Sequence, residues 1–160
     1  MKILYLHGLM SSNQSSKTDW LKQEHIVFNP SLNYKHNSEH IFSELDLLCE
    51  QNHFNLIIGS SMGGHLAFHL SNKHNIPSLL FNPSLEKNSI PKPDVVTVVN
   101  PTILHHIVLG EKDDVVIPAE TIKYLEDHAC NFVYSFENNG HRTPFNIFEK
   151  HFLKIKSSKP

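Results

Sequence analysis

The sequence predicts an α/β fold, a three-layer α/β/α sandwich with about six mostly parallel strands. Short apolar runs rich in Val, Ile, Leu and Phe alternate along the chain with segments whose apolar residues recur at helical spacing. Turn-forming residues follow the apolar runs, as they do the buried strands of a parallel sheet. All six glycines of the chain stand in loops that follow such runs. Strands that alternate with helices are joined by right-handed crossovers, which place helices on both faces of the sheet.

Six runs qualify as strands, because each is short, largely apolar and bounded by turn residues. They cover residues 2–6, 25–28, 55–58, 78–81, 103–109 and 131–136. Helical spacing predicts five helices, around residues 19–24, 41–48, 66–70, 122–129 and 145–155. Pro91, Pro93 and Pro101 argue against a long helix between the fourth and fifth strands. Within that connection, residues 95–99 form either a strand or a buried loop.

The length of 160 residues and the hydrophobic content of 39% fit one domain with a buried core. We expect this domain to span residues 1–156, and residues 157–160 to form a frayed C-terminal tail. The formal net charge is -2 with both signs interspersed, so we expect no basic surface for nucleic acid. The first apolar run is interrupted by His7 and is too short for a signal peptide or a membrane span. The sequence therefore predicts a cytoplasmic protein without nucleic-acid or membrane partners, and it leaves the oligomeric state open.

Among the 13 histidines, His65 and His69 stand four residues apart on one helical face. Two imidazoles at this spacing are able to bind one metal ion. The acidic residue of an HExxH motif is missing, so we interpret both as ordinary polar residues on a helix. Cys49 and Cys130 lie far apart and form no metal-ligand motif, as is usual in a reducing compartment. We therefore expect neither a metal ion nor a cofactor.

We expect the functional residues in the loops that follow the strands, because open parallel sheets bind ligands beyond the carboxyl ends of their strands. The third strand is followed by Gly59-Ser60-Ser61-Met62-Gly63, which fits the pattern GxSxG only with Ser61 at its centre. This pattern is typical of a nucleophile elbow, a sharp strand-to-helix turn that presents a serine hydroxyl. Ser61 is therefore the candidate nucleophile, and the alternative is a serine that only caps the helix.

A serine nucleophile needs a base and an acid, and the order serine, acid, histidine is that of α/β-hydrolases. His141 follows the sixth strand and precedes the last helix, where this order requires the base. His128 and His151 are weaker candidates, because they lie in helical segments and are expected on the surface. Asp113 and Asp114 both follow the fifth strand, and either is able to fix the tautomer of the imidazole. We expect Asp113 and keep Asp114 as the alternative.

Two backbone N–H groups are needed where the oxyanion of the reaction develops. One comes from the residue after the nucleophile and one from the loop after the first strand, which here are Met62 and Leu9. Gly8 allows this loop to approach the elbow closely.

Four segments resemble the YqiA-like bacterial esterases, a branch of the α/β-hydrolase superfamily. They are Leu4-Tyr5-Leu6-His7-Gly8-Leu9-Met10-Ser11-Ser12, Gly59-Ser60-Ser61-Met62-Gly63-Gly64, Asn82-Pro83 and Asp113-Asp114-Val115-Val116. The resemblance spans most of the chain. It implies that Ser61, Asp113 and His141 are the triad of an enzyme that hydrolyses carboxylic esters with short acyl chains.

The chain departs from that family in two respects. The connection between the fourth and fifth strands, residues 86–102, is too short for a helical lid, and the aspartate is doubled. Without a lid we expect an open, shallow site lined by Leu9, Met10, Met62 and Phe145, which disfavours tight binding of long acyl chains.

The sequence as a whole predicts a reduced α/β-hydrolase fold without a lid domain. Its expected function is a cofactor-free serine hydrolase that acts through an acyl-enzyme on a small-molecule carboxylic ester or thioester. One alternative keeps the triad but assigns it an amide, peptide or lipid-derived bond. The other is a hydrolase-like binding module without turnover.

Overall fold

A six-stranded sheet forms the centre of the computed structural model, which describes residues 1–86 and 90–158. The strand order is β2-β1-β3-β4-β5-β6, and every neighbouring pair is parallel. The strands are β1 (Lys2–Leu6), β2 (Ile26–Phe28), β3 (Leu56–Ser60), β4 (Ser78–Phe81), β5 (His105–Gly110) and β6 (Phe132–Glu137). The predicted fold class is confirmed.

Two strands coincide with the predicted ranges, and the other four differ at their ends. They differ because hydrogen-bonded pairing with a neighbouring strand, not local hydrophobicity, determines where a strand begins and ends. Ser60 still belongs to β3 because it pairs with Phe81 of β4. Strands β5 and β6 both begin later than expected, since His105 and Phe132 form their first pair.

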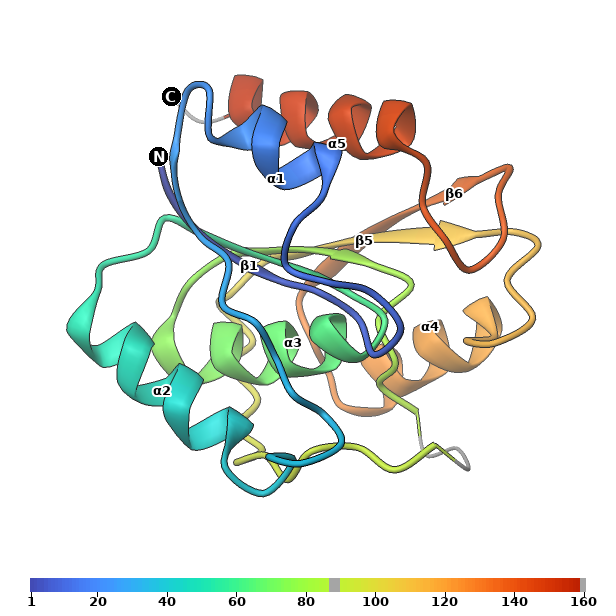
Figure 1. Ribbon diagram of the computed structural model, residues 1–160. Helices are drawn as coiled ribbons and strands as arrows, with labels where there is room; N and C mark the ends of the chain where they lie inside the picture. Colours follow the sequence, from blue (N-terminus) through green and yellow to red (C-terminus); the bar gives the residue numbers. More distant parts are fainter. Residues whose placement is uncertain (87–89, 159–160) are drawn as a thin grey trace.

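Helices cover both faces of the sheet (Figure 1). Helices α1 (Ser16–Leu21) and α5 (Phe145–Ser158) lie on one face, and α2 (Ile41–Gln51), α3 (Met62–His74) and α4 (Pro118–Asp127) lie on the other. Helix α1 begins earlier than expected because Ser15 caps it: Ser15 and Thr18 form a reciprocal capping box.

Helix α5 extends through Ser158 and so includes two residues of the expected frayed tail. The hydroxyl groups of Ser157 and Ser158 donate hydrogen bonds to the carbonyl oxygen of Lys154, at 3.0 and 2.5 Å. These bonds satisfy a carbonyl group in the last part of the helix, where backbone N–H donors run out. Residues 157 and 158 are therefore helical, and residues 159–160 lie outside the described part of the chain.

The strands bury alternate residues on opposite faces, which creates two hydrophobic clusters. From β1, Leu4 and Leu6 pack on the side of α2 and α3, whereas Ile3 and Tyr5 pack on the side of α5. The continuous apolar runs in the sequence reflect this burial on both faces.

Helix α3 is buried along most of its length, because it lies on the central strands and is covered from outside. Among the groups covering it, Asn100 donates its backbone N–H to the side-chain oxygen of Asn72, at 2.8 Å. His65 and His69 lie on this helix, as expected, and both are buried inside the protein.

The connection between β4 and β5 contains no helix in its described residues, 82–86 and 90–104, which agrees with the absence of a lid. Residues 95–99 form neither of the expected structures. They are irregular, and Val96, Val98 and Val99 are exposed. None of the helices in the described ranges is long and apolar enough to cross a membrane. Cys49 and Cys130 are both free thiols.

Candidate active site

Ser61 occupies a strained turn between β3 and α3. Its backbone has φ 53° and ψ -116°, a conformation that non-glycine residues rarely adopt and that clusters at functional sites. Three hydrogen bonds hold the turn. Ser61 N–H donates to the carbonyl oxygen of Phe81 at 3.0 Å, and the carbonyl oxygen of Ser61 accepts the N–H groups of Ser84 at 3.0 Å and His65 at 3.1 Å. This geometry is that of a nucleophile elbow.

Gly63 is required where α3 crosses the end of β1. A Cβ atom at this position would lie 2.5 Å from the carbonyl oxygen of His7, closer than real carbon and oxygen atoms approach. The close packing between the elbow and the loop after β1 therefore depends on the missing side chain.

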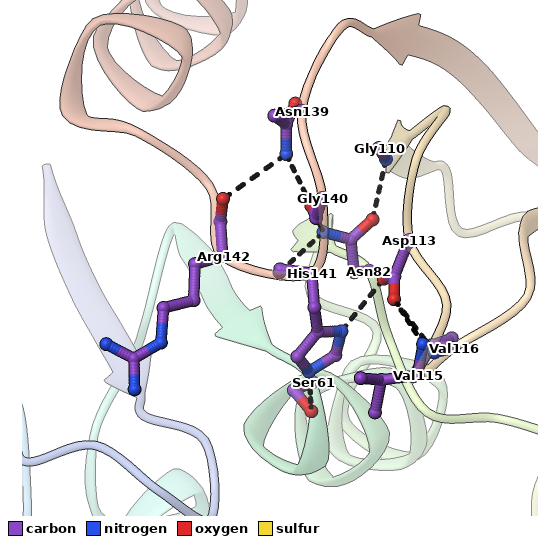
Figure 2. A network of polar contacts seen from close by, with 10 residues as sticks. All are labelled: Ser61, Asn82, Gly110, Asp113, Val115, Val116, Asn139, Gly140, His141 and Arg142. Atoms are coloured by element: carbon purple, nitrogen blue, oxygen red, sulfur yellow. Dashed lines mark hydrogen bonds and ion pairs between the residues drawn. The ribbon is translucent and has the colours of Figure 1, made fainter.

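His141 lies between Ser61 and Asp113 (Figure 2). Its Nε2 is 2.9 Å from Ser61 Oγ, and its Nδ1 is 2.8 Å from Asp113 Oδ2. A carboxylate only accepts hydrogen bonds, so Nδ1 carries the proton and donates a hydrogen bond to Asp113. Nε2 is then the free acceptor for the Ser61 hydroxyl, which is the tautomer that a general base needs.

The structure brings Asp113, and not Asp114, to the histidine. The side chain of Asp113 is fully buried, and its second oxygen, Oδ1, accepts hydrogen bonds from the N–H groups of Val115 and Val116, each at 2.9 Å. Asp114 is exposed. Backbone donors hold the Asp113 carboxylate in one orientation and stabilise its charge.

Met62 and Leu9, the two residues expected to supply oxyanion N–H groups, belong to two segments that meet at Ser61: the start of α3 and the loop after β1. Met62 is the first residue of α3, and the first N–H groups of a helix have no acceptor within that helix. The loop that contains Leu9 passes beside the elbow, since a Cβ atom on Gly8 would lie 3.4 Å from Cβ of Ser61.

His7 anchors this loop, a role that sequence reasoning missed. Its Nδ1 lies 2.8 Å from the carbonyl oxygen of Gly8, and its Nε2 accepts the N–H of Leu32 at 2.9 Å. Tyr34 donates its hydroxyl to the carbonyl oxygen of His7 at 2.5 Å. Burial lowers the pKa of His7, which favours the neutral tautomer that both ring contacts require. The only signal in the sequence was the His-Gly pair, which does not identify the partners.

Met10 and Phe145, the expected substrate-lining residues, differ in their surroundings. Met10 is 81% exposed, whereas the half-buried ring of Phe145 packs edge-on against Trp20 with centroids 5.8 Å apart. Two small hollows of about 70 and 60 Å³ lie beside α5, and neither is lined by Ser61, Asp113 or His141.

The two weaker candidates for the base, His128 and His151, have other partners: the carbonyl oxygen of Tyr124 and the carboxylate of Glu137. His128 is exposed, as expected. His151 is buried, contrary to our expectation of a surface residue, because α5 turns its side chain toward β6, where Nε2 lies 2.7 Å from the Glu137 carboxylate. Sequence periodicity alone did not show which face of α5 packs on the sheet.

The rings of His65 and His69 are 4.8 Å apart, edge to face. Burial lowers the pKa of His65 to about 4 and that of His69 to about 3. No group of three or more His, Cys, Asp or Glu side chains within residues 1–86 and 90–158 is arranged to hold a metal ion.

Residues 2–133 match the uncharacterised protein family UPF0227. This range includes Ser61 and Asp113 and ends before His141. No curated protein sequence matches the chain.

Solved structures with low sequence identity share the fold. A protein from Xanthomonas campestris pv. campestris, assigned to the alpha/beta hydrolase superfamily, aligns with a TM-score of 0.71 and 16% identity over 99% of this chain and 98% of its own. A single-residue variant of SOBER1 from Arabidopsis thaliana aligns with a TM-score of 0.69 and 13% identity over 98% and 99%. A Bacillus cereus carboxylesterase aligns with a TM-score of 0.63 and 19% identity over 98% and 88%. At these identities the likeness concerns the fold.

Proposed function

The chain belongs to the UPF0227 family, a YqiA-like branch of the α/β-hydrolase superfamily, and on this premise we propose that it is a serine hydrolase of small or short-acyl carboxylic esters or thioesters. The observation that carries the proposal is the unbroken series of contacts from Ser61 Oγ through the His141 imidazole to Asp113, at 2.9 and 2.8 Å. Three side chains from three separate loops meet in the arrangement that activates a serine hydroxyl.

In the proposed reaction, Ser61 Oγ attacks the carbonyl carbon of the substrate while His141 Nε2 takes the hydroxyl proton. Asp113 accepts a hydrogen bond from Nδ1 and stabilises the imidazolium that forms. The tetrahedral intermediate collapses when His141 returns the proton to the departing alcohol or thiol, which leaves the acyl group on Ser61. A water molecule, deprotonated by the same imidazole, then releases the acid and restores the serine.

The negative charge of each tetrahedral intermediate develops next to the first turn of α3. In our proposal the N–H groups of Met62 and Leu9 donate hydrogen bonds to this oxyanion, and the positive end of the α3 dipole adds to their effect. The role of the anchored His7 is to keep the loop of Leu9 in place.

The proposed preference for small esters is supported by the surroundings of Ser61. The described part of the connection after β4 forms no helical cover, and Leu9 and Met10 offer an exposed apolar rim rather than a deep channel. Such a rim contacts a short acyl chain over most of its surface but leaves a long chain in water. The carboxylesterase among the structural relatives is in line with this substrate class.

A fluorophosphonate probe, which modifies only activated serines, tests the nucleophile. We expect peptide mapping to find the label on Ser61 alone, and Ser61→Ala to abolish labelling and lower turnover of p-nitrophenyl acetate by at least about a thousandfold. Ser60→Ala is the matched control, because it removes a neighbouring hydroxyl outside the triad. A folded protein that is not labelled would overturn the proposal in favour of a binding module.

The substrate class is tested separately with p-nitrophenyl esters of two to twelve carbons and the corresponding anilides. We expect kcat/KM to be highest for the shortest esters and to be at least about a hundredfold lower for the anilides, whose leaving group is poorer. Comparable rates on anilides, or a maximum at long chains, would instead assign the triad to amide or lipid-derived bonds.

A further inference from the structure

The loop after β4 supplies no member of the triad, but it contacts all three loops that do. The N–H of Ser84 donates to the carbonyl oxygen of Ser61 at 3.0 Å, and the N–H of Asn82 donates to the carbonyl oxygen of Val108 on β5 at 2.9 Å. This loop therefore lies between the elbow after β3 and the loops that follow β5 and β6.

The side chain of Asn82 makes the remaining connections (Figure 2). Its Oδ1 accepts the N–H of Gly110 at 2.7 Å, and its Nδ2 donates to the carbonyl oxygen of His141 at 2.9 Å. A longer contact of 3.5 Å joins Nδ2 to the carbonyl oxygen of Gly140. Asn82 is 1% exposed, so these bonds are formed away from water, where an unpaired partner is costly.

A side-chain amide, which carries one acceptor and one donor group on the same carbon, satisfies both sides of this arrangement. Gly110 offers an N–H group and requires an acceptor, whereas the His141 carbonyl requires a donor. A carboxylate would accept from Gly110 but would oppose the His141 carbonyl oxygen with a second oxygen. The backbone of Asn82 has φ 44°, in the left-handed region that asparagine tolerates better than most residues.

We propose that Asn82 is the positioning residue of this site: its amide fixes the His141 loop relative to the Asp113 loop and so holds the imidazole on Ser61. The inference rests on the proposed function. Gly110 precedes Asp113 by three residues, so the amide links the chain segments of the acid and the base directly. The two loops share a further tie, from the N–H of Lys112 to the carbonyl oxygen of Asn139 at 3.0 Å. We therefore expect removal of the amide to loosen the base without unfolding its loop.

The test variant is Asn82→Gly, because glycine accepts φ 44° without strain and the substitution removes the side chain with its amide. We expect kcat for p-nitrophenyl acetate to fall about 10- to 100-fold and KM to change less than about threefold, since displacement of a catalytic group by about 1 Å has an effect of this size. Asn82→Asp, which retains the acceptor but loses the donor, should change kcat in the same direction. Asn75→Gly is the matched control: Asn75 also has a left-handed backbone, φ 57°, but at the opposite end of α3.

A proton NMR measurement makes the test independent of turnover. The proton that His141 Nδ1 shares with Asp113 gives a strongly downfield resonance, which His141→Gln identifies by its loss. We expect this resonance in the wild type and in Asn75→Gly, and its loss by exchange in Asn82→Gly.

The proposed function and the positioning role of Asn82 fail in different ways. A wild type that hydrolyses no ester, but whose resonance depends on Asn82, would overturn the function and support the positioning role. Unchanged kcat together with a retained resonance in Asn82→Gly and Asn82→Asp would overturn the positioning role alone. A wild type without the resonance would also overturn it, because no fixed pair of His141 and Asp113 would then exist.

Discussion

Asp113 and Asp114 have the same side chain and adjacent positions, yet only one of them meets the imidazole. Asp113 is buried and receives two backbone N–H groups on the oxygen that does not contact His141. Asp114 is exposed to water. The direction of the chain after Gly110 determines which of the two carboxylates contacts His141. No rule of composition or spacing predicts that direction.

We predict that Asp113→Asn lowers kcat for p-nitrophenyl acetate by about a thousandfold or more, because an amide at this position favours the wrong imidazole tautomer. Asp114→Asn should change kcat by less than about twofold. Steady-state kinetics of both variants provide the comparison. Equal losses in the two variants would show that the acid was assigned wrongly.

The buried His69 predicts a pH-dependent stability. Burial first, then the neighbouring His65, His128 and His105, lower its pKa to about 3, whereas in the unfolded chain it lies near 6.5. Above about pH 6.5 neither state is protonated at this residue, so it has no effect there. As the pH falls below 6.5, only the unfolded chain binds the proton, and the free energy of unfolding decreases until the pH reaches the folded-state pKa.

We therefore expect the free energy of unfolding to fall less steeply with decreasing pH in His69→Leu than in the wild type, between about pH 6.5 and 4. The two slopes should differ by on the order of 1 kcal/mol per pH unit. Urea unfolding at several pH values measures this slope, and His53→Gln, at an exposed position, should leave it unchanged. Parallel slopes in the wild type and His69→Leu would contradict the burial of a neutral imidazole.

At the scale of elements, the backbones of β1, β3 and α3 pack closely at one junction of the site. Gly63 lies where the start of α3 meets the carbonyl groups of Leu6 and His7, and Gly59 lies where the end of β3 meets α3. The same approach brings the loop that contains Leu9 beside Ser61. The glycines that close packing requires therefore lie at the same junction as the proposed oxyanion contacts.

Gly63→Ala should destabilise the protein by about 1 to 3 kcal/mol, the usual effect of overpacking. This direction is informative because alanine favours a helix over glycine by about 1 kcal/mol in the absence of a clash. Gly140→Ala is the control, since the nearest atom to its Cβ would be 3.7 Å away, an ordinary contact. Denaturant unfolding curves distinguish the two, and a stabilised Gly63→Ala would contradict the close approach of α3 to β1.

At the scale of the whole molecule, two hydrophobic clusters share one sheet, and each depends on different helices. The cluster on the side of α1 and α5 is smaller and rich in aromatic rings. Phe148 lies at its centre, fully buried, and its ring contacts those of Tyr5, Trp20, Phe81 and Phe152. This cluster holds α5 on the sheet and thereby fixes the end of the His141 loop.

Phe148→Ala should lower the free energy of unfolding by about 3 to 5 kcal/mol, because it removes a large buried side chain and leaves a cavity. Leu153→Ala, on the exposed side of the same helix, should change it by less than about 1 kcal/mol. Chemical denaturation measures both values. Similar values for the two variants would mean that α5 packs on another face.

The sequence predicted the layers of this molecule better than its contacts. Apolar runs and helical spacing located the six strands and five helices of the described residues, because burial and periodicity are local properties of a chain. The burial of His65 and His69 was missed, since it arises from a segment far along the chain that covers α3. Ser61 and His141 could be selected from motif and order, whereas the contacts of Asp113, His7 and Asn82 depend on loop geometry that is visible only in the fold.

The separation of 80 residues between Ser61 and His141 also has a consequence for synthesis on the ribosome. A nascent chain exposes the proposed nucleophile long before the base has been translated. His141 reaches Ser61 only after β6 has paired with β5 and α5 has docked on the sheet. Incomplete chains are therefore expected not to react at Ser61. The appearance of a reactive serine would mark the moment at which β6 and α5 complete the fold.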